Sequence, residues 1–328
     1  MSMKFLFINT KEAFILSQEN ENILDLNILI NDKILSSTSC AGGGGRIAMI
    51  VYIYLLYSLF YMQIIALHII IVSRKGIVIM DINQRLLSNL SAKDREFIMR
   101  IYAEGLEKYE KRICAIDFVD KEYVLDAGCG FGQWSMALAK YNKKVEAIEL
   151  LPERVAFCQK IFMQSGIKNI FIQQGTIEKL PYEDSVFDII WCYSVSYMTN
   201  WRISFRELLR VLKNDGRLYV CTNDAGWYYH MIIDEPNKTS DYNPRENAIK
   251  AFINEWRYNQ GENFIGERVM RIKDVQQELQ NHSCKILSLC GEGRTIFDDS
   301  YADKINPFFR ETYFGENGVY EFVCSKKY

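Results

Sequence analysis

The stretch that decides the fold is Val124-Leu-Asp-Ala-Gly-Cys-Gly-Phe-Gly132. It begins as a short apolar run, which is typical of a buried strand, and it leads directly into residues 133–140, whose apolar side chains have helical spacing. The three glycines between strand and helix let the backbone turn sharply and approach a ligand closely. The free N–H groups at the start of the helix face the same place and favour a carboxylate or a phosphate. We therefore predict a ligand-binding loop; the alternative interpretation is a glycine turn without a ligand.

The same alternation of strand and helix continues on both sides of this loop. Strands are predicted at 123–126, 144–149, 170–173, 187–192 and 217–222, and helices at 91–109, 133–140 and 204–212 and between Pro152 and Gly166. Such alternation predicts an α/β fold with a doubly wound, mostly parallel sheet and helices on both faces. Sheets of this kind bind ligands beyond the carboxyl ends of their strands.

Composition restricts the class of protein. The chain has 328 residues, of which 49% are hydrophobic and 24% charged, and this excludes a disordered chain. A formal net charge of −2 supplies no basic face for nucleic acid, so no nucleic-acid partner is expected. The 9 cysteines form no C-x-x-C pair, which excludes a zinc ribbon and indicates reduced thiols in a cytoplasmic protein. No metal site is predicted.

The first eighty residues differ from the rest. Residues 47–72 carry no formal charge and are long enough to cross a bilayer as a helix, which would anchor the following domain to the cytoplasmic side of a membrane. Residues 1–46 have no assignable role. Met80 opens an ordinary globular sequence, so a second interpretation makes residues 1–79 an over-extended reading frame. A third makes the apolar run a buried helix.

From Met80 to Tyr328 the chain resembles the class I S-adenosylmethionine-dependent methyltransferases, type 11-like, because several motifs of that family occur in order. The segment 126–132 resembles the first motif, and Glu149 resembles the acid that ends the second strand. Residues 175–188 and 208–218 resemble the later segments of the family. The resemblance implies a single domain at 80–328 with a seven-stranded sheet, a final antiparallel strand and an inserted helical lid.

The resemblance also implies S-adenosyl-L-methionine as the cofactor. The residues expected to contact it are Asp126, Gly128, Gly130, Gly132, Glu149, Thr176, Ile177, Cys192 and Tyr193. Gly128 and Gly130 would admit the methionine end of the cofactor against bare backbone. A carboxylate at Glu149 can accept hydrogen bonds from both ribose hydroxyls. Thr176 stands where the family often has an acid, which removes a strong acceptor for the adenine amino group.

The segment expected to select the acceptor is 223–281, the lid or acceptor region. It leaves the fifth strand where ligands bind in such sheets, and it combines Asp224 and His230 with several aromatic residues. These two residues are the candidates for a general base. Helix 244–260 is predicted to carry Phe252 and Trp256 on one face. The acceptor is expected to be a small molecule, a glycan or a lipid-linked compound; the alternative is that the aromatic residues are only the core of the lid.

Two other functions compete with methyl transfer. A nicotinamide-dependent oxidoreductase has a similar sheet, although its loop usually has the spacing G-x-G-x-x-G rather than G-x-G-x-G. A non-catalytic module that binds the cofactor at a membrane is the other. The aromatic segment 291–317 has no functional interpretation beyond packing beside the lid or contacting a second copy of the chain. The sequence leaves the oligomeric state open.

Overall fold

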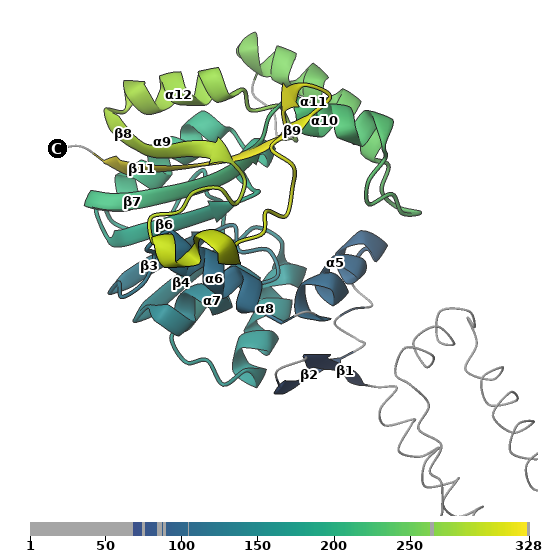
Figure 1. Cartoon of the computed structure of the whole chain (residues 1–328), viewed down its shortest axis with the longest axis vertical. Helices are drawn as coiled ribbons and strands as arrows, with labels where there is room; N and C mark the ends of the chain where they lie inside the picture. The colour runs from purple at the N-terminus through teal and green to yellow at the C-terminus, as the bar shows by residue number, and fades with distance from the viewer. Residues whose placement is uncertain are drawn as a thin grey trace, which may run out of the picture. The chain divides into compact units, whose positions relative to one another are not determined.

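The computed structural model describes residues 68–73, 76–83, 87, 90–103, 105–262 and 266–326. Contacts divide the chain into the units Met1–Ile64 and Ile65–Tyr328, and all described residues belong to the second unit. Within it, seven strands form one sheet with helices on both faces (Figure 1).

The sheet has the strand order β5-β4-β3-β6-β7-β11-β8. The strands are β3 (Tyr123–Ala127), β4 (Lys144–Glu149), β5 (Ile170–Gln174), β6 (Phe187–Tyr193), β7 (Leu212–Asn223), β8 (Cys284–Gly291) and β11 (Val319–Lys326). The pairs from β5 to β7 are parallel, whereas β11 is antiparallel to both of its neighbours, β7 and β8. The predicted α/β class, the seven strands and the antiparallel last strand are confirmed.

Eight helices accompany the sheet in the described residues. They are α5 (Ala92–Ala103), α6 (Glu107–Ala115), α7 (Gln133–Tyr141), α8 (Pro152–Gln164), α9 (Trp201–Val211), α10 (Ala225–Ile233), α11 (Pro244–Asn259) and α12 (Ile272–Asn281). Neighbouring residues of β3 face opposite sides, as in any strand: Val124 packs in a core with α5 to α8, and Leu125 packs in a second core with α9 and α12. Both faces of the sheet are therefore covered, which explains why its strands read as apolar runs.

The predicted helix 91–109 is in fact two helices. Helix α5 ends at Ala103 and α6 begins at Glu107. Gly105 lies between them with a φ of +75°, a left-handed conformation that interrupts a helix and that glycine adopts without strain. The prediction was wrong because the apolar spacing continues across this break.

The predicted membrane helix 47–72 lies for the most part outside the described residues. Its last five residues belong to strand β1 (His68–Ser73), which pairs antiparallel with β2 (Gly76–Asn83), so the prediction of a helix is wrong for that part. Among the residues that the structure describes, no helix is long and apolar enough to cross a membrane.

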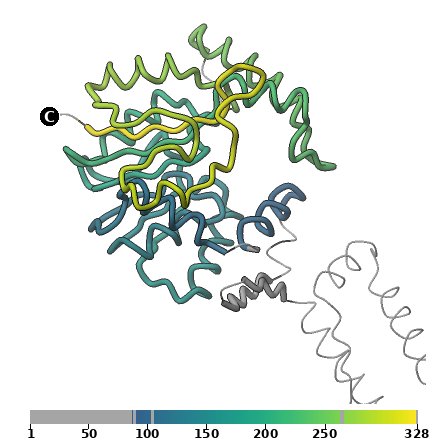
Figure 2. Tube along the Cα trace, viewed as in Figure 1, coloured from purple at the N-terminus to yellow at the C-terminus, as the bar shows by residue number. Residues whose placement is uncertain are grey.

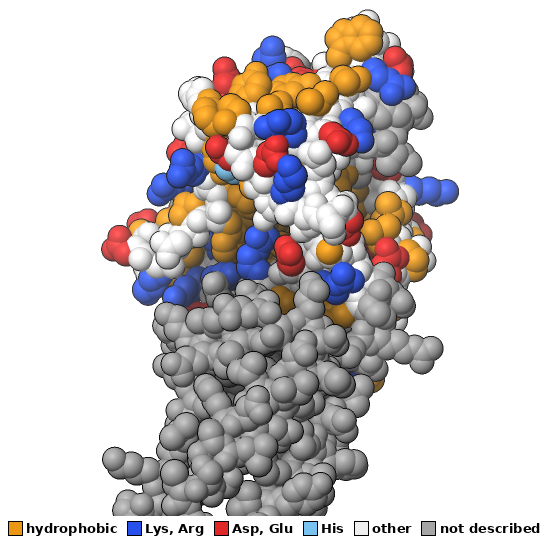
Figure 3. Space-filling view, turned by 90° about the vertical axis from the view of Figure 1, so that its right-hand side faces the viewer, with side chains coloured by type: hydrophobic (Ala, Val, Ile, Leu, Met, Phe, Trp, Pro, Cys, Tyr) orange, Lys and Arg blue, Asp and Glu red, His pale blue; other side chains and the backbone are white. Residues whose placement is uncertain are grey.

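Helices α10 and α11 form a small layer of their own at the end of β7. Their shared core includes Tyr228, Ala248 and Ala251, and Phe252 packs against it. The prediction that Trp256 shares one face with Phe252 is wrong, because the Trp256 side chain is 63% exposed. Hydrophobic side chains gather at the top of the face seen in Figure 3, the end of the molecule where Figure 1 places α11.

The long aromatic segment between β8 and β11 leaves and rejoins the sheet at the same place, because Gly291 pairs with Tyr320, and between these points it passes α6 and α10 (Figure 2). It contains the short helix η2 (Asp299–Lys304) and the strands β9 (Thr312–Tyr313) and β10 (Glu316–Asn317). Phe309 contacts Trp227 of α10 with ring centroids 5.1 Å apart, so the segment packs beside the lid.

Candidate functional site

The glycine loop begins where β3 ends, and hydrogen bonds to β4 fix its path. The N–H groups of Gly128 and Cys129 both donate to the carbonyl of Ile148, each at 2.9 Å. Gly128 has a φ of +85°, and a Cβ at this position would lie 2.5 Å from a methyl group of Val195. Only glycine therefore fits here, for reasons of both conformation and space.

The loop is open on one side. A Cβ added at Gly130 would meet no atom within 4 Å, whereas one added at Gly132 would lie 2.6 Å from the ring of Phe162. Gly132 has a φ of +82° and is the N-cap of α7, where no side chain caps the helix. The backbone around Gly130 is thus exposed to a ligand while Gly132 holds the helix against α8.

Glu149 lies beside this open face, as the sequence predicted it would. Its side chain is largely buried, and its two oxygens accept hydrogen bonds from the N–H groups of Gly130 and Leu151, each at 3.0 Å. Because a carboxylate can accept about four hydrogen bonds, two backbone donors leave acceptor capacity for a diol. The structure therefore places the Glu149 carboxylate beside the glycine loop, although Glu149 lies 17 residues after Gly132 in the chain.

Asp126 lies under the loop and not on its surface. Its side chain is 1% exposed and accepts a hydrogen bond of 2.6 Å from the hydroxyl of Ser135 on α7. Burial raises the pKa of Asp126 to about 7, and the Ser135 hydrogen bond opposes that rise. This carboxyl group consequently changes its charge near neutral pH.

Of the remaining cofactor candidates, Ile177 and Cys192 have side chains in the protein core, whereas Thr176 and Tyr193 are half-buried. Ile177 and Cys192 are buried in the core beneath α9, and burial raises the pKa of the Cys192 thiol to about 12. The Tyr193 hydroxyl donates to Glu292 at 2.8 Å, and its ring lies against Trp134. Thr176 accepts a hydrogen bond of 3.2 Å from the N–H of Glu178. Because the side chains of Cys192 and Tyr193 are engaged within the protein, only the backbone of these two residues can contact a ligand.

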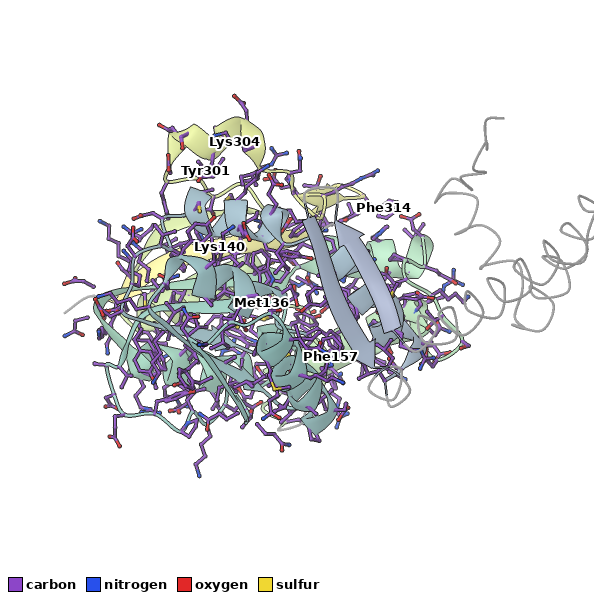
Figure 4. The ribbon with its side chains drawn as sticks, turned by 90° about the horizontal axis from the view of Figure 1, so that it is seen from below. Met136, Lys140, Phe157, Tyr301, Lys304 and Phe314 are labelled. Carbon is purple, nitrogen blue, oxygen red and sulfur yellow. The ribbon has the colours of Figure 1, made fainter. Side chains whose placement is uncertain are left out.

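Helix α5 packs directly on the loop. The Tyr102 hydroxyl donates to the carbonyl of Phe131 at 2.6 Å, and its ring lies 6.4 Å from that of Phe157. Met136 of α7 and Phe157 of α8, both labelled in Figure 4, complete this support. Tyr102 therefore couples the position of α5 to that of the loop, a contact that no motif indicated.

Asp224 has a structural role, because it caps a helix and links two backbone segments. As the N-cap of α10 it accepts hydrogen bonds from the N–H of Ala225 at 2.6 Å and from the N–H of Ile272 at 3.1 Å. Burial raises its pKa, and those two backbone hydrogen bonds oppose the rise. It fixes the point where the lid departs and the point where α12 begins.

His230 lies further along α10. Its Nδ1 is 2.6 Å from an oxygen of Asp234, one helical turn away, and its ring stacks on Tyr313 at 4.5 Å. These contacts join the lid to the segment before β11. That either His230 or Asp224 accepts a proton from a substrate stays a prediction.

A family model described as a methyltransferase domain matches residues 124–216. An uncharacterized methyltransferase, YcgJ of Bacillus subtilis, is 34% identical over 156 residues, which are 47% of this chain and 54% of that protein. A sterol 4-C-methyltransferase of Caenorhabditis elegans is 29% identical over 129 residues, 39% of this chain and 35% of that protein. The chain spans about half, or less, of the length of these curated relatives.

Among solved structures, a geranyl diphosphate methyltransferase in complex with S-adenosylmethionine has a TM-score of 0.49 and 13% identity. That alignment covers 71% of this chain and 90% of the other.

The match begins inside β3 and contains the whole glycine loop, Glu149 and β6. Residues 124–216 therefore match a methyltransferase domain, which is a similarity over part of the chain.

Proposed function

We propose that the protein transfers a methyl group from S-adenosylmethionine to a small-molecule or lipid-linked acceptor in the cytoplasm. The observation that carries this proposal is the open backbone at Gly130 lying within hydrogen-bond distance of the Glu149 carboxylate. A bare backbone suits the amino-acid end of the cofactor, and a carboxylate suits its two ribose hydroxyls.

The residues of the loop fit this ligand. Gly128, Gly130 and Gly132 would admit the methionine end, Glu149 would hold the ribose, and Asp126 would supply a carboxylate beneath the loop. Thr176, Ile177 and the backbone of Cys192 and Tyr193 would border the rest of the molecule. Bound there, the sulfonium supplies an electrophilic methyl group, and the domain lowers the barrier largely by holding donor and acceptor close and aligned.

The proposed acceptor class follows from the lid. The half-buried rings of Tyr229 on α10 and Phe252 on α11 stack with their centroids 5.4 Å apart, so the layer beside the carboxyl ends of β6 and β7 is aromatic. Aromatic walls suit an apolar or ring-shaped body. The relatives named as a sterol methyltransferase and as malonyl-[acyl-carrier protein] and ubiquinone-biosynthesis methyltransferases of bacteria act on compounds with such bodies or with acyl carriers.

Two experiments test the proposal. Calorimetry with S-adenosylmethionine, with its demethylated product and with NAD distinguishes a methyltransferase from an oxidoreductase; we expect heat with the first two only. Methyl-labelled cofactor is then incubated with the protein and a small-molecule extract of its source cells, and a labelled product is expected. Binding without any labelled product would favour the non-catalytic module.

A further inference from the structure

An extended segment, Gly266–Arg271, crosses the carboxyl ends of β6 and β7 and returns the chain from α11 to α12. We call it the strap. Its backbone is fixed at two points, because Arg268 N donates to the carbonyl of Tyr197 at 3.0 Å and Met270 N donates to the carbonyl of Asn223 at 3.0 Å. The strap therefore lies where such sheets bind their ligands.

Neighbouring side chains of the strap point in opposite directions, as in any extended segment. Arg268 is fully buried and its guanidinium lies 4.4 Å from the centre of the Tyr258 ring on α11. Glu267 faces the other way, and the side chains whose charges or hydroxyls interact with its carboxylate are Lys93, Tyr197, Tyr228 and Tyr242. These four groups come from α5, from η1 (Ser196–Met198), from α10 and from the turn before α11.

The cluster adjoins the cofactor loop. Tyr197 follows Val195, whose methyl groups fill the space beside Gly128, by two residues. Arg154 acts electrostatically on both Lys93 and Tyr197, and its guanidinium lies 4.8 Å from the ring centre of Phe131 in the loop. The cluster around Glu267 is thus connected to the loop through Arg154.

Glu267 is unusual among the acids of the described residues. Its carboxylate takes part in no hydrogen bond or ion pair with any described side chain, although the residue is half-buried. Burial raises the pKa of Glu267 to about 7, and the Lys93 ammonium opposes this rise. Lys93 itself lies 3.4 Å from the centre of the Tyr242 ring, which holds the ammonium in the cluster.

We propose that Glu267 is the catalytic base of the acceptor site and that it takes the proton of a hydroxyl group on an acceptor with an apolar or aromatic body. This inference rests on the proposed methyl transfer and assigns its acceptor side. The half-buried rings of Tyr197 and Tyr242 supply walls for that body. The Lys93 ammonium favours an acceptor oxygen that becomes negative and disfavours a cationic amine, whereas Arg154 pairs with Asp94 at 2.9 Å.

The step balances without any further reactant. A lone pair of the acceptor oxygen forms the new bond to the methyl carbon, and the carbon–sulfur bond breaks with its electron pair remaining on sulfur. The acceptor O–H bond releases its proton to the Glu267 carboxylate, and the proton leaves to water after the product departs. Only an ionised Glu267 can do this, so the rate of transfer should rise with pH through about 7.

The test compares Glu267→Gln with Glu262→Gln in the full chain. Glu262 is exposed and pairs with Arg257 at 2.6 Å, so it controls for the loss of a charge from the lid. The readouts are S-adenosylmethionine affinity by calorimetry and the rate of labelling of the source-cell extract by carbon-13 methyl cofactor. The third readout is titration of the Glu267 carboxyl carbon by NMR, as the difference between the unmodified protein and Glu267→Gln.

We expect Glu267→Gln to bind the cofactor normally, to lower the transfer rate roughly 10²–10⁴-fold and to lose the pH dependence near 7. The NMR difference should titrate near pH 7, and the product should carry its new methyl on oxygen. Glu262→Gln should change none of these. Unchanged transfer in Glu267→Gln, or a product methylated on nitrogen, overturns the assignment of Glu267 while the proposed function stands.

A second variant excludes a purely structural ion pair. If Glu267 only closes the lid onto Lys93, Lys93→Met should lower transfer as much as Glu267→Gln does, and both variants should keep the pH dependence. If Glu267 is the base, the transfer rate of Lys93→Met should still depend on pH, with its midpoint shifted to higher pH because the ammonium that opposes the rise in the pKa of Glu267 is gone. Failure of the unmodified protein to bind S-adenosylmethionine would instead reject the proposed function itself.

Discussion

Replacing Asp126 by Asn should stabilise the protein at alkaline pH and much less at acidic pH. The Asp126 side chain is buried beneath the cofactor loop, accepts a hydrogen bond from Ser135, and has a pKa raised by burial to about 7 from an ordinary value of 3.8. Asn has the same shape and can accept the same hydrogen bond, but it has no charge to bury.

The magnitude follows from proton linkage. Between pH 4 and 7 the folded protein holds a proton on Asp126 that the unfolded chain has lost, so the free energy of unfolding falls as pH rises through this range. Each pKa unit corresponds to about 1.4 kcal/mol, so the cost of Asp126 is about 4 kcal/mol at pH 8 and about 1.5 kcal/mol at pH 5. The advantage of Asp126→Asn should therefore grow by about 2.5 kcal/mol from pH 5 to pH 8.

Urea unfolding without cofactor at pH 5 and pH 8, followed by tryptophan fluorescence, measures this difference. Asp303→Asn serves as the control because Asp303 is exposed in η2, and it should leave the pH dependence of stability unchanged. An equal effect of Asp126→Asn at both pH values would refute the reasoning, since it would show that Asp126 is ionised throughout.

Three further predictions concern the loop and the core. Gly128→Ala should weaken S-adenosylmethionine binding at least about tenfold and lower the free energy of unfolding by about 2–3 kcal/mol, because the added Cβ collides with Val195 in a backbone that is already left-handed. Gly166→Ala is the control, because Gly166 has a φ of +68° and open space around it, and it should lower the free energy of unfolding by only about 1 kcal/mol. Thermal unfolding and calorimetry measure both variants. Glu149→Ala should weaken cofactor binding roughly 100-fold in calorimetry, because two hydrogen bonds to a charged acceptor are lost. Arg112→Met should lower the free energy of unfolding by about 3–5 kcal/mol in urea titrations, because Arg112 is buried between two carboxylates. Lys140→Met, at an exposed ion pair, should cost at most about 1 kcal/mol, and equal losses would contradict the prediction for Arg112.

The sequence predicts the sheet well because its central strands are buried on both faces and therefore form apolar runs. Strand β4 has the predicted bounds, Lys144–Glu149, and the cofactor loop with its neighbouring carboxylate lies as expected. Both features are local: each depends on residues within about one strand–turn–helix unit. The break at Gly105 was missed because one glycine does not disturb the apolar spacing around it.

The acceptor side could not be predicted in the same way. Glu267 belongs to no motif, and its neighbours Lys93 and Tyr197 are 174 and 70 residues away in the chain. Only the tertiary fold brings the strap across the ends of β6 and β7. His230 and Asp224 were singled out because they are polar residues among aromatic ones, yet that pattern does not distinguish a helix cap or a surface ion pair from a base.

A buried cation joins the middle of the chain to its last strands. Arg112 of α6 contacts Glu292 and, at 2.9 Å, Glu321, which lie 180 and 209 residues later. Tyr219 donates to the same Glu321 at 2.7 Å. Strand β8 pairs only with β11 within the sheet, so β8 can join the sheet only after residues 319–326 are in place.

This order matters while the ribosome is still at work. In a nascent chain whose β11 has not yet left the ribosome, the guanidinium of Arg112 lacks Glu321, and one edge of the sheet is incomplete. We therefore expect the domain to close only after translation has passed residue 321. A chain stalled before that point should be digested by a protease that the finished protein resists.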